Sequence, residues 1–457
     1  MFKRILVANR GEIAMRIMRC CMELGIETVL AYSKADEDSL PVQYAAKAVC
    51  VGPAPAGASY LNQDALIQTA LAYNCEAVHP GYGFLSENAE FARRCEENGI
   101  TFIGPSHEKI SRMGDKQSAR ELMIKSGVPV VPGSDGLLKD ADDAVRTAER
   151  IGFPVLIKAS AGGGGRGMRI AYGPDEVKEA FESARAEAVS AFANGDMYME
   201  KYIVCPRHIE VQLIGDKHGH VVHLGERDCS LQRRSQKMVE EAPAYCLNDE
   251  QRKGICEAAL KAARAVDYDS VGTVEFVLDK DGNFYFIEMN TRIQVEHPVT
   301  EMVTGIDLMK AQIRSAAGVP LPFTQDDIQI RGHAIECRIN AEDPAKNFAP
   351  MPGDIRFIHF PCGAGVRIET SLYSGSTISP FYDSMISKVI VHAEGRLEAI
   401  RRMRMALAEF TVDGVKTNAD FLYLLMFHPE YLKGNVTTAF FEEHVAELLE
   451  WDHDSGI

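Results

Sequence analysis

The sequence predicts an α/β protein with several domains, and three observations lead to that prediction. Short apolar segments alternate with helical patterns through about the first hundred residues, which is typical of a parallel sheet covered by helices. From residue 204 onward, apolar residues recur at every second position, as in antiparallel strands. The length of 457 residues exceeds what one hydrophobic core supports, so we expect about two to four domains.

The N-terminal segment predicts an open, doubly wound parallel sheet. "RILVA" is a short buried strand, and "GEIAMRIMRCCMELG" places apolar residues at helical spacing and closes on Gly25 as a C-cap. "ETVLAYS" is the next strand, and the alternation continues through "AVHPGYGF" and "TFIGPS". We therefore expect a Rossmann-like domain over residues 1–114, followed by a connector over 115–136.

The remaining elements predict two or more further domains. Residues 137–203 form a small unit containing a helix, the strands "PVLIKAS" and "MRIAY", a long helix and the strand "MYMEKYI". Residues 204–330 contain the strands "RHIEVQLIG", "HVVHLGE", "GTVEFVLD" and "NFYFIEMN", with a helical pattern at 305–317. Residues 331–446 mix the strands "GHAIECRIN", "DIRFIHF" and "MISKVIVHA" with mostly helical sequence from about 396, and 447–457 form a tail.

Composition excludes several classes of protein. A formal charge of −16 argues against a nucleic-acid binder, so any polyphosphate site must come from a local cluster of cations and backbone N–H groups. There is no apolar run of about 18 residues, so we expect no membrane span. The N-terminus does not resemble a signal peptide, and eleven cysteines without metal-binding spacing indicate buried free thiols in the cytoplasm.

The glycine-rich stretch "KASAGGGGRGM", residues 158–168, predicts a functional lid. A dinucleotide-binding loop would open a helix, but a strand follows here, and a Walker loop would need Lys and Ser or Thr after its last glycine. A glycine-rich hairpin tip between two strands remains. Because each glycine costs about 0.5–1 kcal/mol in an ordered segment, we interpret the run as a tip that folds over an anion rather than as a plain surface turn.

Two carboxylates are predicted to face each other across a hairpin. If Asp281 and Gly282 form a two-residue turn, Lys280 pairs with Asn283 and Glu275 lies opposite Glu288. Like charges at that separation destabilise a sheet unless a cation lies between them. Carboxylate oxygens are ligands that Mg²⁺ or Mn²⁺ prefers, so we predict a metal site, against the alternative of an exposed pair beside a lysine.

Polar residues continue beyond the second carboxylate. If the strand stays extended, one face carries Glu288, Asn290, Arg292, Gln294 and Glu296, although the extended geometry is expected to fail after about Asn290. These polar residues either line a cavity next to the predicted metal site or form an ordinary solvent-exposed face of the strand.

Several cations lie in apolar or polar-rich segments. Lys116, Lys158 and Lys237 are each typical of a surface lysine when taken singly, but together they form a set of counter-charges for a triphosphate. His208 alternates with Glu210 and Gln212 on one strand face, and its pattern leaves packing and phosphate contact both open.

Seven segments together resemble biotin carboxylase of the ATP-grasp superfamily, over roughly residues 1–446. They are "VANRGEIAMRI", "HPGYGFLSEN", "MGDK", "KASAGGGGRGM", "DCSLQRRSQK", "EMNTRIQVEHPVTE" and "ECRINAEDP". The resemblance implies an ATP-grasp fold with an N-terminal doubly wound domain, a mobile lid at 162–167 and a C-terminal α+β domain. It also implies carboxylation of biotin by bicarbonate with MgATP (or MnATP), through carboxyphosphate that yields CO₂.

The resemblance also implies roles for individual residues. ATP would be bound by Lys116, Lys158, Gly163, Gly164, Gly165, Glu200, Lys201, Ile203, His208, Gln232, Glu275 and Glu288. The metal would be bound by Glu275, Glu288 and Asn290, and bicarbonate by Lys237, Arg292, Gln294 and the Val295 N–H. Glu296 would deprotonate bicarbonate and Arg338 would stabilise the biotin enolate, which makes Lys237, Arg292, Glu296 and Arg338 the catalytic set.

Two features bear on partners and affinity. The sequence contains no Met-Lys-Met acceptor, so we expect biotin to arrive on a separate carrier protein and the carboxyltransferase to be another chain. The resemblance suggests a homodimer and an acetyl-CoA carboxylase of fatty acid synthesis, or alternatively a pyruvate or other acyl-CoA carboxylase. Ser235 stands where the family commonly has a larger polar residue, which puts the nucleotide affinity in question.

Two other functions stay open at this point. A different ATP-grasp ligase, of the carbamoyl-phosphate synthetase or purine carboxylase type, would share the lid and metal pair but not "RIQVEHPVTE" with "ECRINAEDP". A catalytically silent nucleotide-binding scaffold is opposed by the complete charge set of Lys237, Glu296 and Arg338.

Overall fold

The computed structural model describes residues 1–160, 167–192 and 194–455. Contacts divide the chain into two units, one made of Met1–Val128, Arg207–Phe276 and Glu288–Ile457, and the other of Pro129–Pro206 and Val277–Ile287. We refer to them as unit 1 and unit 2 and describe each by itself. The finer domain boundaries expected from the sequence stay a prediction.

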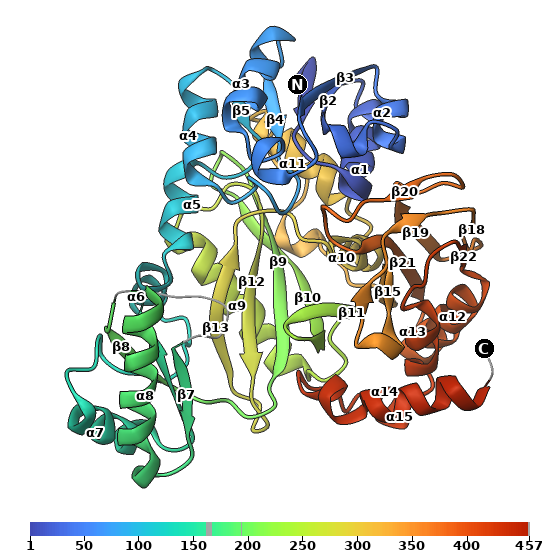
Figure 1. The fold of residues 1–457 in the computed structure, drawn as a ribbon. Coiled ribbons are helices and arrows are strands. Elements are labelled where there is room, and N and C mark those ends of the chain that lie inside the picture. Colours follow the sequence, from blue (N-terminus) through green and yellow to red (C-terminus); the bar gives the residue numbers. More distant parts are fainter. Residues whose placement is uncertain (161–166, 193, 456–457) are drawn as a thin grey trace. The chain divides into compact units, whose positions relative to one another are not determined.

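Unit 1 begins with a five-stranded parallel sheet in the order β3-β2-β1-β4-β5 (Figure 1). Its strands are β1 Arg4–Val7, β2 Glu27–Ser33, β3 Lys47–Gly52, β4 Ala77–His79 and β5 Thr101–Phe102. The connecting helices are α1 Gly11–Glu23, α2 Leu40–Tyr44, α3 Gln63–Ala72 and α4 Ala89–Glu97, followed by α5 His107–Gly114 and α6 Lys116–Lys125. The predicted doubly wound parallel sheet is confirmed.

Apolar residues on both faces of β1 explain why this sheet is covered twice. Ile5 and Val7 belong to one apolar cluster with residues of α1 and α11 (Leu308–Ala316), whereas Leu6 belongs to a second cluster with residues of α3 and α4. Successive strand residues point to opposite faces, so a continuously apolar strand needs helices on both sides.

An eight-stranded sheet in the order β13-β12-β9-β10-β11-β14-β21-β19 organises the rest of unit 1, and the division counts the ends of β12 and β13 next to their connecting turn, within Val277–Ile287, in unit 2. The strands are β9 Arg207–Gly215, β10 Val221–Arg233, β11 Gln236–Ala242, β12 Val271–Leu278, β13 Phe284–Asn290, β14 His333–Asn340, β19 Val366–Thr370 and β21 Met385–Ala393. β11 pairs antiparallel with β14, with Val239 opposite Cys337. One sheet therefore joins the segments that the sequence analysis assigned to a central and a C-terminal domain.

Helices and short strands complete unit 1. The helices are α9 Asp249–Ala265, α10 His297–Thr304, α11, α12 Arg396–Glu409, α13 Ala419–Leu425, α14 Pro429–Lys433 and α15 Phe440–Ser455. The short strands are β15 Glu342–Asp343, β16 Ala349–Pro350, β17 Gly353–Asp354, β18 Phe357–His359, β20 Thr377–Ile378 and β22 Thr411–Asp413. The predicted single strand "DIRFIHF" is wrong, because its residues fall into β17 and β18, which pair with different partners.

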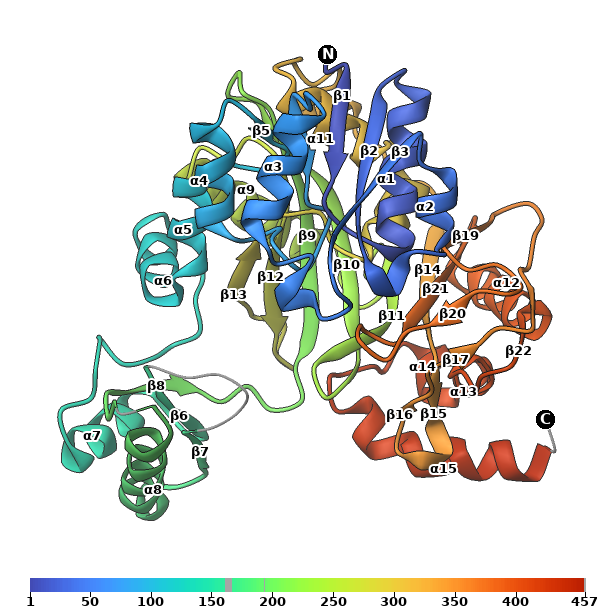
Figure 2. The same cartoon turned by 45° about the horizontal axis from the view of Figure 1, so that its top comes forward.

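Unit 2 is a three-stranded antiparallel sheet in the order β7-β6-β8, with two helices beside it (Figure 2). The strands are β6 Val155–Ala159, β7 Met168–Ala171 and β8 Met197–Lys201, and the helices are α7 Ala141–Ile151 and α8 Pro174–Phe192. Val155 and Ile157 of β6 are fully buried with Met197 and Met199 of β8 in one apolar cluster. Lys158 pairs with Met168, so the strands that flank the glycine run form the predicted hairpin, while residues 161–166 at its tip lie outside the described residues.

The cysteines agree only in part with the prediction of buried free thiols. All eleven are free, but Cys50, Cys205 and Cys362 are exposed.

Among the described helices, none has the length and apolar character that crossing a bilayer requires.

Candidate active site

Lys237 on β11 is surrounded by three carboxylates. Its Nζ atom lies 2.5 Å from Glu210 of β9 and 3.0 Å from Glu275 of β12. It also lies 2.7 Å from Glu296, which precedes α10. Burial lowers the pKa of Lys237, but these carboxylates outweigh burial and hold the pKa well above its usual value. Lys237 is therefore a fixed positive charge where three elements of unit 1 meet.

A fully buried arginine, Arg227, forms hydrogen bonds with residues of this cluster. Arg227 on β10 donates to Glu210 at 2.6 Å, and its other donors reach neutral side-chain oxygens of the neighbouring elements: Gln212 at 2.6 Å, Thr300 at 2.9 Å, Thr273 at 3.3 Å and Gln294 at 2.8 Å. A buried guanidinium is stable only when paired and hydrogen-bonded in this way. Arg227 thus orients both Glu210 and the Gln294 amide.

The Glu275 carboxylate contacts several of the predicted site residues. The His208 Nε2 atom lies 3.0 Å from one of its oxygens, and the amides of Asn290 and Gln294 each donate to the other oxygen at 2.8 Å. Burial raises the pKa of Glu275, but Lys237 and His208 outweigh it and lower the pKa overall. Burial also opposes the charging of His208, yet Glu275 and Glu210 raise its pKa to about 9. His208 therefore carries a positive charge at neutral pH.

Glu288 is influenced by the charge of Glu275. Burial raises the pKa of Glu288, and the charge of Glu275 raises it further against the opposing charge of Lys116. Among the described residues, no cation forms an ion pair with Glu288. Two carboxylates and the Asn290 amide oxygen supply the hard oxygen ligands that Mg²⁺ prefers, so the donor set fits the predicted metal.

The predicted register of the hairpin that carries these carboxylates is wrong at its tip. The Asp279 N–H donates to the Asn283 carbonyl at 2.8 Å and the Gly282 N–H to the Asp279 carbonyl at 3.2 Å, so the loop has three residues and Lys280 does not pair with Asn283. Gly282 has φ +86°, which a three-residue loop with a type I turn requires. With Asp279 and Asn283 as the closing pair, the count that placed Glu275 opposite Glu288 no longer applies, so their direct opposition stays a prediction. The charge of Glu275 contributes to raising the pKa of Glu288.

The polar row after Glu288 does not continue as a strand. β13 ends at Asn290 and the chain turns into α10 at His297, which confirms that the extended geometry fails near Asn290. Gln294 and Glu296 nevertheless reach the cluster, through Glu275 and Lys237 respectively. Arg292 donates to Glu87 at 2.9 Å and to the Asn290 side-chain oxygen at 2.9 Å, and the Val295 carbonyl accepts from Lys388 at 2.8 Å.

Arg338 on β14 completes the cluster on the other side of Glu296. Its Nε atom donates to Glu240 at 2.6 Å and a terminal nitrogen donates to Glu296 at 2.9 Å. Burial raises the pKa of Glu296, but Lys237 and Arg338 are among the charges that lower it overall, so Glu296 is ionised at neutral pH. Burial, with a contribution from Glu296, raises the pKa of Glu240 to about 7.

The remaining predicted residues lie elsewhere. In unit 2, Lys158 lies 2.5 Å from Glu200, and Lys201 donates to the Gly152 carbonyl at 3.0 Å, with Ile203 two residues further on. Gly163, Gly164 and Gly165 lie outside the described residues. In unit 1, Gln232 donates to the Cys229 carbonyl at 2.8 Å, and Ser235 occupies an exposed two-residue turn between β10 and β11 with φ +65°.

Sequence reasoning missed Arg227, Glu240 and Glu87, and used Glu210 only as part of a strand pattern. Polar residues at inward-facing positions of otherwise apolar strands are the signal that could have found the first two. Glu87 lies in the quoted segment "HPGYGFLSEN", but no local pattern indicates its contact with Arg292, which is 205 residues away.

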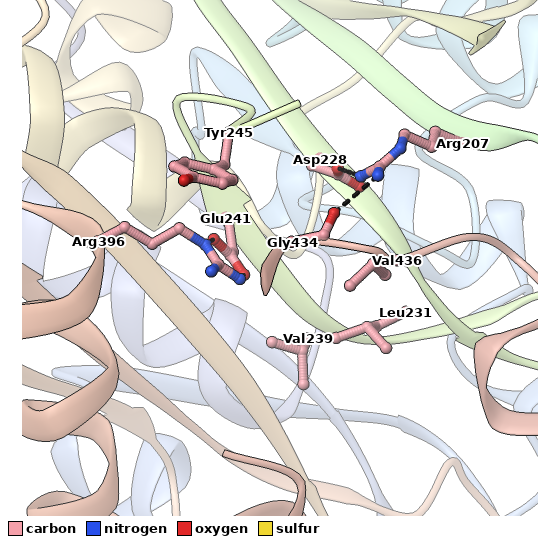
Figure 3. Close-up of a pocket in the computed structure, with 9 residues that line it drawn as sticks. All are labelled: Arg207, Asp228, Leu231, Val239, Glu241, Tyr245, Arg396, Gly434 and Val436. Carbon is pink, nitrogen blue, oxygen red and sulfur yellow. Dashed lines mark hydrogen bonds and ion pairs between the residues drawn. The ribbon is translucent and has the colours of Figure 1, made fainter. Parts of the chain in front are cut away.

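A small pocket elsewhere in unit 1 does not include any predicted site residue (Figure 3). Arg207 reaches Asp228 at 3.5 Å and the Gly434 carbonyl at 2.7 Å there, and Arg396 pairs with Glu241 at 2.7 Å. Its charged groups are already paired, so we do not assign the reaction to it.

Comparison with known proteins identifies the family of this chain. The family described as "Biotin carboxylase, N-terminal domain" matches residues 1–110, "Carbamoyl-phosphate synthase L chain, ATP binding domain" matches 115–324, and "Biotin carboxylase C-terminal domain" matches 336–443. A biotin carboxylase from a Nostoc species is 53% identical over 442 residues, covering 97% of this chain and 99% of the relative. The 2-oxoglutarate carboxylase small subunit of Hydrogenobacter thermophilus is 53% identical over 444 residues, with 97% and 94% covered.

A solved structure of the biotin carboxylase domain dimer of the Hydrogenobacter thermophilus 2-oxoglutarate carboxylase matches with a TM-score of 0.89. It is 53% identical, 97% of this chain and 98% of that chain are covered, and it holds MgADP, ADP and bicarbonate. Fold and site together define an ATP-dependent ligase of the ATP-grasp class. Within that class, the chain belongs to the biotin carboxylase family.

This membership confirms the resemblance stated from the sequence, together with the predicted fold class and enzyme class. It also confirms the predicted activity, the ATP-dependent carboxylation of biotin with bicarbonate. The other two functions left open by the sequence are thereby excluded.

Proposed function

We propose that this chain carboxylates biotin carried on a separate carrier protein, as the first half-reaction of a biotin-dependent carboxylase whose carboxyltransferase is a different chain. The observation that supports this most directly is the alignment of Lys237, Glu296 and Arg338, in which one carboxylate lies between two fixed cations. Such a set binds a small anion and removes its proton within one site.

Bicarbonate is bound, in this proposal, by two cations, an amide and a backbone donor. Lys237 and Arg292 contribute charge, Gln294 contributes an amide, and the Val295 N–H contributes a backbone donor. Support comes from the contacts of Lys237 and Gln294 with the same Glu275 oxygen, at 3.0 and 2.8 Å. The net negative charge of the whole chain makes such a local cluster necessary.

Glu296 acts as the general base on bicarbonate. It is ionised at neutral pH because neighbouring cations lower its pKa, and it has one oxygen toward Lys237 and the other toward Arg338. The proton moves from the bicarbonate hydroxyl to Glu296 as the anion attacks the γ-phosphate of ATP, giving carboxyphosphate and ADP. The C–O bond of carboxyphosphate then breaks, which releases CO₂ and phosphate. The phosphate takes the N1′ proton of biotin, Arg338 stabilises the resulting enolate with its guanidinium, and the biotin N1′ atom attacks CO₂.

We assign the metal to carboxylate and amide oxygens, and the phosphates to cationic side chains. Glu275, Glu288 and Asn290 hold Mg²⁺ or Mn²⁺, which bridges and neutralises phosphate oxygens. Lys116, Lys158 and His208 contact phosphates, and the residues near Glu200, Lys201 and Ile203 contact the base. The family resemblance assigns ATP binding to Gly163, Gly164 and Gly165, which lie outside the described residues, and to Gln232.

The assembly and the acceptor are also part of the proposal. The partners are a biotin carboxyl carrier protein, carboxyltransferase subunits and a second copy of this chain, in the cytoplasm. The dimeric state of the solved 2-oxoglutarate carboxylase domain supports a homodimer. We propose an acetyl-CoA carboxylase, with a pyruvate or other acyl-CoA carboxylase as the alternative. The alternative stays open because similar relatives are named for 2-oxoglutarate (53% identical) and for pyruvate (52% identical).

Product analysis tests the proposal. The purified chain is given ATP, Mg²⁺, ¹⁴C-bicarbonate and free biotin, and both ADP and acid-labile carboxybiotin are measured. We expect biotin to accelerate ADP release and to become labelled, whereas ADP release that ignores biotin would contradict the proposal. Identification of the carrier and transferase chains that co-purify tests the acceptor.

A further inference from the structure

A group of three metal-ligating side chains lies at the C-terminal end of unit 1, away from the active site. His428 directly precedes α14, and His444 and Glu447 lie three residues apart on α15. One ligand atom from each of the three lies within 4.8 Å of the others. We call this set the C-terminal histidine cluster. The other two such groups among the described residues share Glu210 and belong to the active site.

The spacing in the cluster fits metal ligands better than hydrogen bonds. One Glu447 oxygen lies 3.4 Å from the His428 Nε2 atom and 3.7 Å from the His444 Nδ1 atom. A good hydrogen bond between such atoms would be about 2.7–3.2 Å. Ligands about 2.0–2.1 Å from a tetrahedral Zn²⁺ are roughly 3.3 Å apart, which is close to both observed separations.

His428 is a buried imidazole without a good polar partner. The residue is 2% exposed, and its Nδ1 atom has no hydrogen-bond partner among the described residues. Its ring packs against His444 with centroids 4.4 Å apart, against Phe440 at 5.2 Å and against Trp451 at 5.7 Å. The other ring nitrogen, Nε2, makes the long contact of 3.4 Å with Glu447. Burial of a poorly paired polar ring is unfavourable, so a metal ion bound at Nε2 would stabilise it.

Access from solvent is available on one side of the cluster. The Glu447 side chain is 48% exposed and the His444 side chain 24% exposed, whereas His428 is enclosed by aromatic rings. The cluster thus combines a buried side chain, two partly exposed side chains and an apolar shell. An apolar shell of this kind controls the access of solvent to a metal ion.

We propose that the C-terminal histidine cluster is a Zn²⁺ site, with His428, His444 and Glu447 as protein ligands and water in the fourth position. Two imidazoles and one carboxylate suit Zn²⁺, in contrast to the oxygen ligands at the active site, which suit Mg²⁺. The ion would replace the long His428–Glu447 contact between the start of α14 and α15 with two coordinate bonds, and so stabilise the C-terminal helix of the chain.

A crystallographic experiment locates the ion. Crystals of the full-length chain are soaked in ZnCl₂, and anomalous differences are measured above and below the zinc absorption edge. We expect a peak within about 2.3 Å of a nitrogen of each histidine and of a Glu447 oxygen. A map with zinc at the active-site carboxylates and none at the cluster would overturn the proposal.

Variants test the same site in solution. The chain is stripped with EDTA and titrated calorimetrically with ZnCl₂, and its melting temperature is measured with and without Zn²⁺. His444→Gln should lose one equivalent of Zn²⁺ binding, or weaken it at least about tenfold, and should lose the zinc-dependent rise in melting temperature. His359→Gln is the control, because His359 pairs with Glu409 at 3.0 Å in a similar exposed His–Glu pair.

Both variants change residues that are at least partly exposed, so their folding is easily verified. Glu447→Gln provides a second test and should weaken binding in the same direction. Unchanged stoichiometry and affinity in both His444→Gln and Glu447→Gln would overturn the proposal, as would equal losses in the His359→Gln control.

Discussion

The Nζ atom of Lys237 lies 2.7 Å from a carboxylate oxygen of Glu296, and the other oxygen of Glu296 lies 2.9 Å from Arg338. A base between two cations stays ionised without losing its position, because each oxygen has its own partner. The same cations attract the anion on which the base acts. This relationship determines which substitutions should separate binding from chemistry.

Removing the charge of Lys237 should impair bicarbonate-dependent ATP cleavage. We expect Lys237→Gln to lose activity by about 10²-fold or more, because the cation that binds bicarbonate and holds Glu296 is gone. The measurement is ADP release with and without bicarbonate. Lys261→Gln, on the exposed side of α9, is the matched control and should keep full activity. Retention of bicarbonate dependence in Lys237→Gln would refute the role.

Neutralising Glu296 should abolish proton removal while leaving ATP binding intact. We expect Glu296→Gln to lower kcat by about 10²–10⁴-fold, with little change in the affinity for ATP. Steady-state kinetics and nucleotide binding by calorimetry give the two quantities. Full activity in Glu296→Ala would remove the proposed base altogether.

Glu288→Gln should weaken the dependence on metal. One of the two carboxylates that we propose as ligands becomes neutral, so the Mg²⁺ concentration at half-maximal activity should rise by about tenfold or more. A titration of activity with Mg²⁺ at saturating ATP tests this. Asp281→Asn, on the exposed tip of the same hairpin, should leave the titration unchanged. An identical titration for Glu288→Gln would contradict the metal assignment.

Arg227 should matter for stability more than any exposed arginine. Arg227→Met leaves Glu210 buried beside fewer cations, and breaking a buried pair in this way costs about 3–5 kcal/mol of unfolding free energy. Urea titrations followed by circular dichroism measure the change. Arg93→Met on α4, where the partners Glu90 and Glu97 are exposed, should cost less than about 1 kcal/mol. Similar losses in both variants would contradict the assigned role.

His79 should make stability depend on pH. Burial, and to a lesser extent the charge of Arg16, lowers the pKa of His79 to about 3 in the folded state, against about 6.5 when unfolded. Below pH 6.5 the unfolded chain therefore binds a proton that the folded chain does not, and the free energy of unfolding falls with pH by at most about 1.4 kcal/mol per unit. The loss ends once the pH passes below about 3.

Urea titrations at several pH values between about 5 and 7.5 test this dependence. His79→Gln should show a shallower slope than the parent chain. Equal slopes in the parent and His79→Gln would contradict the assignment.

Local patterns predicted much of the fold because they depend on residues near one another in the chain. The apolar alternation of "RILVA" and "ETVLAYS" correctly predicted parallel strands, and the strands around the glycine run pair as expected. The pairing of β11 with β14 could not be predicted, since about ninety residues separate these strands and no local preference selects the partner.

The turn between β12 and β13 shows where pattern reasoning misleads. Asp281-Gly282 is a strong signal for a two-residue turn, yet Asp279 and Asn283 close a three-residue loop instead. Asp279 accepts from the backbone N–H groups of Asp281 and Asn283, at 2.9 and 2.8 Å, and so stabilises the longer loop.

The sequence by itself determined the class of fold, the family and the identity of most acidic and basic groups at the site, because motif residues and periodicity are properties of the chain alone. Only the tertiary structure decided which of those charges meet. Lys237 and Arg338 lie about a hundred residues apart in the chain. Folding brings a side-chain nitrogen of each to within 3 Å of a Glu296 oxygen. The buried support of Arg227 and the separate histidine cluster at the C-terminal end are likewise decided by packing, since burial and distance do not exist until the sheet has formed.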